Sequence, residues 1–314
     1  MEAMEMTTRR RKRFERSTLP IPMQLTERSL RLLAEVGRHR FLSSTQLAAL
    51  DGGSPQNVLR LLRTLFDNLY LDRPVGQLAS MPIQGPQAMV YGLAPKGARA
   101  LREHGYRLDG RGDWTEKNNK RAGAIFIEHT LAIAKFLTAV EVSCRARADV
   151  ELVRDHEIIA DAPEVTRRAR EPLRWVVRPE HSRNEVWSVV PDGLFALSFA
   201  DGTAAYFLVE IDRATIPIAR NSNDHHSIVR KFEAYYQGWR ANRHVEQFGV
   251  KQMRVLMVTE SAERVSNMLS AIDKITGGKG SNFFLLIDKP TLAASDPLQV
   301  EWTSGKRIAV KLTD

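Results

Sequence analysis

Three carboxylates stand at the ends of one apolar stretch, residues 191–212. Asp192 precedes the run GLFALSF, and Glu210 and Asp212 close the run AAYFLVEID. The Asp-Gly pair at 201–202 favours a tight hairpin turn, so the two runs are predicted to be paired strands with Asp192 near Glu210. Side chains alternate along a strand, so Glu210 and Asp212 share one face. Carboxylates so placed repel one another unless a cation lies between them, which predicts a Mg²⁺ site on Asp192 and Glu210 with Asp212 beside it.

A metal ion in such a site could activate a water and stabilise the charge that develops on a phosphate. A further acid, Glu128, interrupts an apolar helical pattern at 124–144, where a carboxylate is costly unless it is paired or bound. The alternative is a structural cluster that serves DNA or protein binding, with the acids hydrogen-bonded by Arg213 and its neighbours.

The elements before residue 110 predict a DNA-binding domain. Apolar residues at helical spacing predict three helices, at 26–36, 44–50 and 54–69. Two short strands, within 69–76 and 88–97, and a helix through 97–105 follow. Three helices and a two-stranded ribbon are typical of a winged helix-turn-helix, whose third helix enters the major groove of DNA.

The polar face of this third helix supplies candidate DNA contacts. Amide and guanidinium groups can bond in pairs to base edges, which we expect of Gln56, Asn57 and Arg60. Contacts to phosphates are expected of Arg63, Arg73 and Lys96. The alternative is a winged helix that binds protein and whose charged residues are only solvated.

Positive charge is concentrated in the same region. Residues 1–110 hold 17 of the 46 Lys and Arg but only 10 of the 37 Asp and Glu, so they carry +7 of the net charge of +9. Residues 1–25 include the run RRRKRFER and show no apolar periodicity, which predicts a disordered basic arm. Clustered cations gain affinity for phosphates by releasing counterions, so double-stranded DNA is the expected partner. Solubility alone is the alternative explanation of the charge.

The rest of the chain predicts a second domain. Residues 108–123 are polar and predict a linker before a domain at 124–314, and residues 26–107 form the first domain. Helical and strand patterns alternate through 124–288 and predict a mixed sheet flanked by helices, so the fold class is α+β or α/β. On a helix predicted at 224–246, Tyr235, Tyr236 and Trp239 either pack on the sheet or stack bases. His225 and His226, at its start, are expected to cap the helix or face solvent.

Composition excludes several classes of protein. No stretch approaches the roughly 18 apolar residues of a membrane helix, and no apolar segment follows the basic start as in a secretory signal, so we expect a cytoplasmic protein. The single cysteine, Cys144, excludes an intrachain disulfide and a cysteine metal cluster.

The order of these motifs resembles the replication-relaxation family of plasmid and mobile-element proteins. The segments that carry the resemblance are EHTLAIAKF, VVPDGLFAL, FLVEIDRAT and KFEAYYQ. The second half also resembles the PD-(D/E)XK nuclease superfamily. The resemblance implies a winged helix-turn-helix followed by a restriction-endonuclease-like domain. It implies double-stranded DNA, replication or relaxosome proteins and a second copy of the chain as partners to be tested.

The resemblance also implies a set of catalytic residues: Asp192, Glu210, Asp212, Lys231 and Glu128. The lysine of the superfamily would fall where Asp212 stands, and Lys231 on the following helix could take its place or be an ordinary surface lysine. Two functions stay open. One is a DNA-binding protein acting in replication, relaxation or transcription control, and the other is a Mg²⁺-dependent endonuclease directed by its winged helix.

Overall fold

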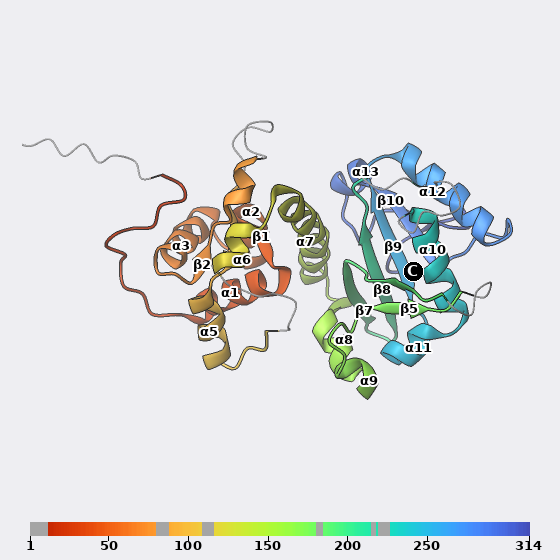
Figure 1. The fold of residues 1–314 in the computed structure, drawn as a ribbon, viewed down its shortest axis with the longest axis horizontal. Helices are drawn as coiled ribbons and strands as arrows, with labels where there is room; N and C mark the ends of the chain where they lie inside the picture. The colour runs from red at the N-terminus through yellow and green to blue at the C-terminus, as the bar shows by residue number, and fades with distance from the viewer. Residues whose placement is uncertain (1–11, 80–87, 109–115, 180–184, 215–217, 219–226) are drawn as a thin grey trace, which may run out of the picture. The chain divides into compact units, whose positions relative to one another are not determined.

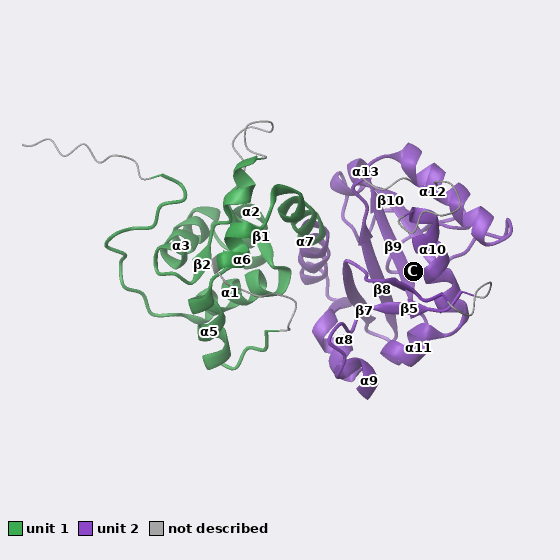
Figure 2. Ribbon diagram, viewed as in Figure 1, with its two compact units in different colours: residues 1–134 green, residues 135–314 purple. Residues whose placement is uncertain are grey.

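The computed structural model describes residues 12–79, 88–108, 116–179, 185–214, 218 and 227–314. The chain divides into two compact units, residues 1–134 and 135–314 (Figure 2). The division falls within one long helix, α7 (Ala124–Arg145). In the described residues, no helix combines the length and the apolar character needed to span a membrane.

Unit 1 consists of short helices around a small antiparallel sheet of order β1-β3-β2 (Figure 1). Besides the first half of α7, its elements are α1 (Glu27–His39), β1 (Phe41–Ser43), α2 (Ser44–Asp51), α3 (Pro55–Asp67), β2 (Leu71–Asp72), the 3₁₀ helix η1 (Val75–Ala79), β3 (Val90–Leu93), α5 (Pro95–Glu103) and α6 (Glu116–Arg121).

Local sequence explains where the first three helices begin. Thr26 accepts a hydrogen bond from the backbone of Ser29, and Ser43 from that of Gln46, so a side chain caps each of the first two helices. Pro55 occupies the first turn of α3, where its missing N–H costs no hydrogen bond. The three predicted helices are confirmed, each within a few residues of its expected ends.

Three elements of unit 1 were not predicted, and one of them is the short 3₁₀ helix η1. Strand β1 has three residues, too few for a periodic pattern, and it forms by pairing with β3, where Phe41 lies opposite Gly92. Helix α6 lies within the segment predicted as a linker, and its Asn119 is buried and donates to Leu93 O at 2.9 Å. The predicted wing includes residues 80–87, which lie outside the described residues.

Unit 2 is built on a seven-stranded mixed sheet of order β12-β11-β10-β9-β8-β7-β4, with a separate pair of β5 and β6. Its strands are β4 (Val150–Arg154), β5 (Trp175–Val177), β6 (Trp187–Val189), β7 (Gly193–Phe199), β8 (Ala204–Ile211), β9 (Arg254–Thr259), β10 (Phe284–Asp288), β11 (Trp302–Ser304) and β12 (Ala309–Val310). Its helices, besides the second half of α7, are α8 (Asp155–Asp161), α9 (Glu164–Arg167), α10 (Ile228–Arg240), α11 (Arg243–Phe248), α12 (Ala262–Ile275) and α13 (Lys289–Ala293). The predicted mixture of helices and a mixed sheet is confirmed.

The centre of this sheet joins the predicted hairpin to two parallel strands. β7 and β8 pair antiparallel, with Gly193 opposite Val209 and Ser198 opposite Ala204, so the turn lies at the predicted Asp-Gly pair. β8, β9 and β10 are parallel neighbours. Their carboxyl ends therefore share one edge of the sheet, where Glu210 closes β8.

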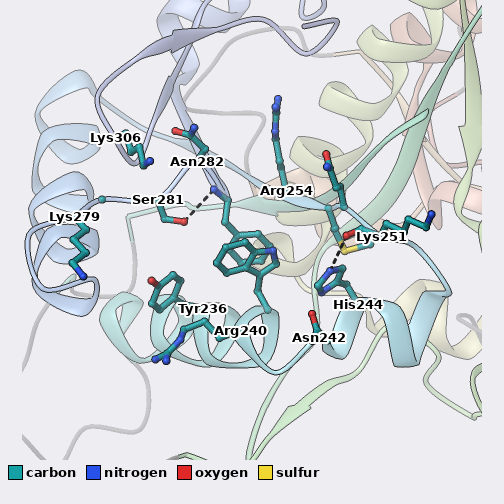
Figure 3. Close-up of a pocket in the computed structure, with 15 residues that line it drawn as sticks. Tyr236, Arg240, Asn242, His244, Lys251, Arg254, Lys279, Ser281, Asn282 and Lys306 are labelled. Carbon is teal, nitrogen blue, oxygen red and sulfur yellow. Dashed lines mark hydrogen bonds between the residues drawn. The ribbon is translucent and has the colours of Figure 1, made fainter. Parts of the chain in front are cut away.

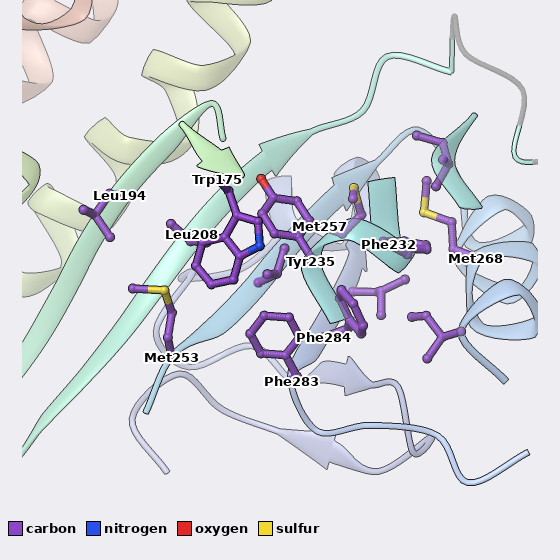
Figure 4. Close-up of a cluster of buried hydrophobic side chains, with 14 of the residues drawn as sticks. Trp175, Leu194, Leu208, Phe232, Tyr235, Met253, Met257, Met268, Phe283 and Phe284 are labelled. Atoms are coloured by element: carbon purple, nitrogen blue, oxygen red, sulfur yellow. The ribbon is translucent and has the colours of Figure 1, made fainter. Parts of the chain in front are cut away.

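Apolar side chains cover both faces of the sheet. On one face α10 and α12 bury a cluster around Trp175, Phe232 and Tyr235 (Figure 4). On the other, the ring of Phe136 from α7 meets Phe195 edge to face at 6.2 Å between centroids. The strands thus read as nearly continuous apolar runs because both faces are covered.

Two predicted elements differ from those observed. The predicted helix at 224–246 is two helices, α10 and α11, separated at Asn242, whose φ of 57° is left-handed. The strand expected through 151–159 ends at Arg154, because Glu157 accepts a hydrogen bond from the Arg154 backbone and α8 begins there. His225 and His226 lie outside the described residues.

Candidate functional site

The first candidate site is the outer face of α3. Its inner face buries Val58, Leu62 and Leu65, whose helical spacing fixes the orientation of the helix. The four predicted DNA contacts on this helix are all exposed: Gln56, Asn57, Arg60 and Arg63. Neither arginine of the four forms an ion pair within the described residues. The fold therefore exposes two guanidinium groups and two amides on one face of α3.

The other two predicted contacts make more bonds within unit 1. The Arg73 guanidinium lies 4.0 Å from the centroid of the Phe66 ring and donates to the Tyr91 hydroxyl at 3.2 Å. Lys96 is exposed, and its Nζ donates to Asn68 O at 3.1 Å. Both cations lie near the carboxyl end of α3. A phosphate would have to bind alongside these internal bonds or replace them.

Several residues of the predicted arm contact unit 1, among them Ser17, whose backbone N–H donates to Asp67 Oδ1 at 3.0 Å, and Met23, which packs against its core. Arg16 lies 4.1 Å from the centroid of the Phe66 ring, donates to Leu71 O at 3.1 Å and pairs with Asp72. Residues 12–25 contain no helix or strand, and residues 1–11, which hold part of the basic run, lie outside the described residues. The described end of the arm thus meets unit 1 beside the carboxyl end of α3.

The second candidate site is the acid cluster at the end of the hairpin in unit 2. Glu210, at the end of β8, is 2% exposed, and each of its carboxylate oxygens accepts a hydrogen bond from α10. Oε2 accepts from Lys231 Nζ at 2.6 Å, and Oε1 accepts from the Tyr235 hydroxyl at 2.6 Å. Lys231 and Tyr235 are one helical turn apart, so one face of α10 supplies both donors.

Asp192 lies beside this pair on the neighbouring strand. Its backbone N–H donates to Val209 O at 2.9 Å, which continues the β7 and β8 ladder by one residue. Its Oδ2 accepts from the Ile211 N–H at 2.8 Å. The structure thus brings Asp192 close to Glu210, as the hairpin predicts, and places Lys231 against Glu210.

Burial and charge set the proton affinities of this group. Burial raises the pKa of Glu210 and the nearby Asp192 charge adds to that rise, while Lys231 opposes it. For Lys231, burial acts to lower the pKa, but the charges of Glu210, Asp192 and Asp212 outweigh it and leave the pKa above its usual value. Burial raises the pKa of Tyr235 well above the usual value, so its hydroxyl stays a donor. The lysine therefore stays protonated against a group of acids.

The third acid, Asp212, faces a different set of partners. Its side chain is almost fully buried and pairs with Arg264 of α12, whose Nη2 donates to Oδ1 at 3.0 Å. Thr259 Oγ1 donates to Oδ2 at 2.6 Å, and the Ala214 N–H donates to Oδ1 at 3.2 Å. The compensating charge for Asp212 is thus a protein cation that was not among the candidates from sequence.

The hydrogen bonds made by these acids bear on whether the acids could bind Mg²⁺. No group of three or more His, Cys, Asp or Glu side chains suited to a metal ion occurs among the residues that the structure describes. Both oxygens of Glu210 already accept hydrogen bonds, so a cation would have to displace Lys231 or Tyr235 to reach them. A Mg²⁺ ion bound to Glu210 would therefore replace one of these two hydrogen bonds, and the Mg²⁺ site stays a prediction.

Glu128 is half-buried on the part of α7 that belongs to unit 1, whereas the other predicted catalytic residues belong to unit 2. Its predicted place at the edge of the acid cluster stays a prediction.

A family model described as replication-relaxation matches residues 33–252, more than half of the chain. The chain belongs to the replication-relaxation family. This confirms the family resemblance and indicates a role in the replication or relaxation of a plasmid or mobile element. The family match includes α3, Asp192, Glu210 and Lys231, and it ends before Arg264. No curated protein and no solved structure matches the chain.

Three residues that bond to the acids in this family member were not identified as site residues from sequence: Tyr235, Thr259 and Arg264. Tyr235 carried a usable signal, because its spacing of four from Lys231 places both on one helix face. Arg264 carried none, since it is 52 residues from its partner Asp212.

Proposed function

We propose that the protein binds duplex DNA through unit 1, acting as a winged helix-turn-helix, in the replication or relaxation of a plasmid or mobile element. Unit 2 is then a restriction-endonuclease-like scaffold whose acids are neutralised by its own cations. Because DNA is the proposed partner, we also propose that the protein acts in the cytoplasm.

The observation that carries this proposal is the outer face of α3. Arg60 and Arg63 stand exposed on it without an internal ion pair among the described residues, while the opposite face is anchored in the core. The order of elements adds support, because β1 lies between α1 and α2 and pairs with β3, as a winged helix requires of its small sheet.

The basic arm fits the same partner. Arg16 holds the described end of the arm beside Phe66, at the carboxyl end of α3. Lys12 and Arg13, with the basic residues that precede them, would then add contacts to phosphates close to the helix that reads bases.

The experiment is a duplex-binding titration at several salt concentrations. Replacing Gln56, Arg60 and Arg63 together by Ala should lower affinity at least about 10-fold, since removing a side chain that bonds to a base costs on the order of 1–3 kcal/mol. The matched control replaces Arg99 and Arg102, two exposed arginines of α5, and removes the same charge.

The triple variant and the control distinguish a specific face from net charge. Equal affinities for wild type and the triple variant at low salt would rule out binding through α3. An equal drop in affinity for both variants would mean that the general charge of unit 1, and not the α3 face, binds DNA.

A second candidate function is a metal-dependent endonuclease, and the observation that favours it is the position of Lys231. This lysine reaches Glu210 from α10, and that contact supports Lys231 as the relocated lysine expected from the PD-(D/E)XK resemblance.

Incubation of supercoiled plasmid with Mg²⁺ or Mn²⁺ tests this second function directly. Nicking by wild type that disappears in Asp192→Asn and in Lys231→Met would establish it. Wild type that neither nicks DNA nor gains thermal stability from millimolar Mn²⁺ would leave unit 2 as a scaffold.

A further inference from the structure

An open pocket of unit 2 lies away from the acid cluster. It has a volume of about 780 Å³ and lies between the end of α10, the segment that enters β9 and the segment that enters β10 (Figure 3). Because β8, β9 and β10 are parallel, this pocket lies at the amino ends of β9 and β10. Glu210 and Asp212 lie at the carboxyl end of β8. The two sites therefore occupy opposite edges of the sheet.

The lining of this pocket is cationic. Five of its side chains carry positive charge, and none of its residues is Asp or Glu; the five are Arg240, Lys251, Arg254, Lys279 and Lys306. Within the described part of the chain, four of them form no ion pair with a carboxylate: Lys251, Arg254, Lys279 and Lys306. A concave surface lined by one sign of charge concentrates counter-ions, so the expected ligand is an anion.

Aromatic rings form one wall of the pocket. The Tyr236 and Trp239 rings stack with centroids 5.9 Å apart at 26°, and the Trp239 and Phe283 rings stack at 5.3 Å and 21°. Trp239 is the middle ring, which makes Tyr236 the outer one. Tyr236 is only half-buried, so a planar group can extend the stack on it. The sequence left open whether Tyr235, Tyr236 and Trp239 pack the helix or stack bases. All three pack on the core, and the half-buried Tyr236 also keeps part of its side chain exposed for stacking.

We propose that this pocket binds single-stranded nucleic acid, with a base stacked on Tyr236 and the backbone phosphates held by Lys279, Lys306 and neighbouring cations. Stacking on an aromatic ring needs an unpaired base, because the faces of bases in a duplex are already covered. The volume suits one or two nucleotides of a longer strand. This proposal rests neither on duplex binding by α3 nor on the chemistry of the acid cluster.

The test uses the full chain and an oligothymidine of about 12 nucleotides that carries 5-iododeoxyuridine, a length within the usual site sizes. Irradiation should cross-link the strand to peptides that contain Tyr236 or Trp239, located by mass spectrometry. Tyr236→Leu should weaken binding about 10-fold because the base no longer has a ring to stack on, and Tyr236→Phe should retain the wild-type affinity.

Salt dependence tests the role of the lysines. Replacing both Lys279 and Lys306 by Ala should reduce the slope of log affinity against log salt by about 1.4, since each phosphate that a lysine neutralises contributes about 0.7 to that slope. The control replaces Lys135 and Lys274, exposed lysines of unit 2 outside the pocket lining, and should leave the slope unchanged.

Duplex binding measured on the same variants separates this proposal from the one for α3, because pocket variants should bind duplex as wild type does. Cross-links found only in unit 1, together with wild-type affinity in all pocket variants, would overturn the proposal. Binding of free thymidine triphosphate that depends on Tyr236, with no such dependence for the oligonucleotide, would also overturn it in favour of a free nucleotide site.

Discussion

The charged residues of α3 and the acids of the hairpin differ in their burial and in their pairing with other groups of the protein. Arg60 and Arg63 stand in solvent and form no internal ion pair among the described residues. Glu210 and Asp212 are buried, and every one of their carboxylate oxygens accepts a hydrogen bond from the protein. A residue that makes no internal bond contributes little to folding, whereas a buried charge is costly once its partner is removed.

This contrast separates stability from binding in a measurable way. Substitutions on α3 should change DNA binding and leave stability unaltered, and substitutions in the acid cluster should change stability first. Unfolding of unit 2 can be followed by tryptophan fluorescence, because four of the five tryptophans lie in unit 2: Trp175, Trp187, Trp239 and Trp302.

The largest effect is expected from Asp212→Ala. The change leaves the Arg264 guanidinium, whose side chain is 14% exposed, without its carboxylate, which should lower the free energy of unfolding by about 3–5 kcal/mol. Denaturant titration of wild type and variant measures the difference. Glu263→Ala, which removes an exposed acid of the same helix as Arg264, should cost far less. Similar decreases in the two variants would show that the ion pair of Asp212 and Arg264 adds no more stability than an exposed acid does.

A smaller decrease in stability is expected from Glu210→Gln, about 1–3 kcal/mol, because Lys231 loses its charge partner while an amide can still accept from Tyr235. If the acids instead repel one another and await a cation, the same change should preserve or raise stability. Urea titration distinguishes the two signs, with Glu301→Gln as an exposed control.

Alkaline pH should weaken the same pair. The pKa of Lys231 is raised in the folded protein, so its contribution to stability is fully present below the unfolded value of 10.5 and is lost as pH rises through the folded value. We therefore expect the stability difference between wild type and Lys231→Met to be constant from neutral pH to about pH 10 and to shrink above that. A difference that does not change with pH would mean that the charge of Lys231 contributes no stability.

The smallest effect on stability is expected from Arg60→Ala, within about 0.5 kcal/mol, since the side chain is exposed and unpaired within the described residues. Thermal unfolding followed by circular dichroism measures this, and duplex titration of the same sample should show weaker binding with relaxed base preference. A variant that loses stability and keeps its affinity would reverse the roles assigned to α3 and the acid cluster.

Local patterns in the sequence were enough to predict the parts of this protein that depend on neighbouring residues. The caps at Thr26 and Ser43 begin helices where expected, and the Asp-Gly turn sets the register that brings Asp192 beside Glu210. The polar face of α3 follows from the apolar stripe opposite to it. Each of these features involves residues a few positions apart or a single turn, so propensity and periodicity fix it.

The partners of those residues depend on how distant segments pack. Arg264 meets Asp212 only because α12 lies on the face of the sheet to which Asp212 points, and β1 exists only through its pairing with β3. The cationic pocket likewise joins the end of α10 to two segments that enter β9 and β10. No local pattern encodes such contacts, because they follow from burying apolar faces on both sides of one sheet. That packing supplies the protein donors that bond to Asp192, Glu210 and Asp212.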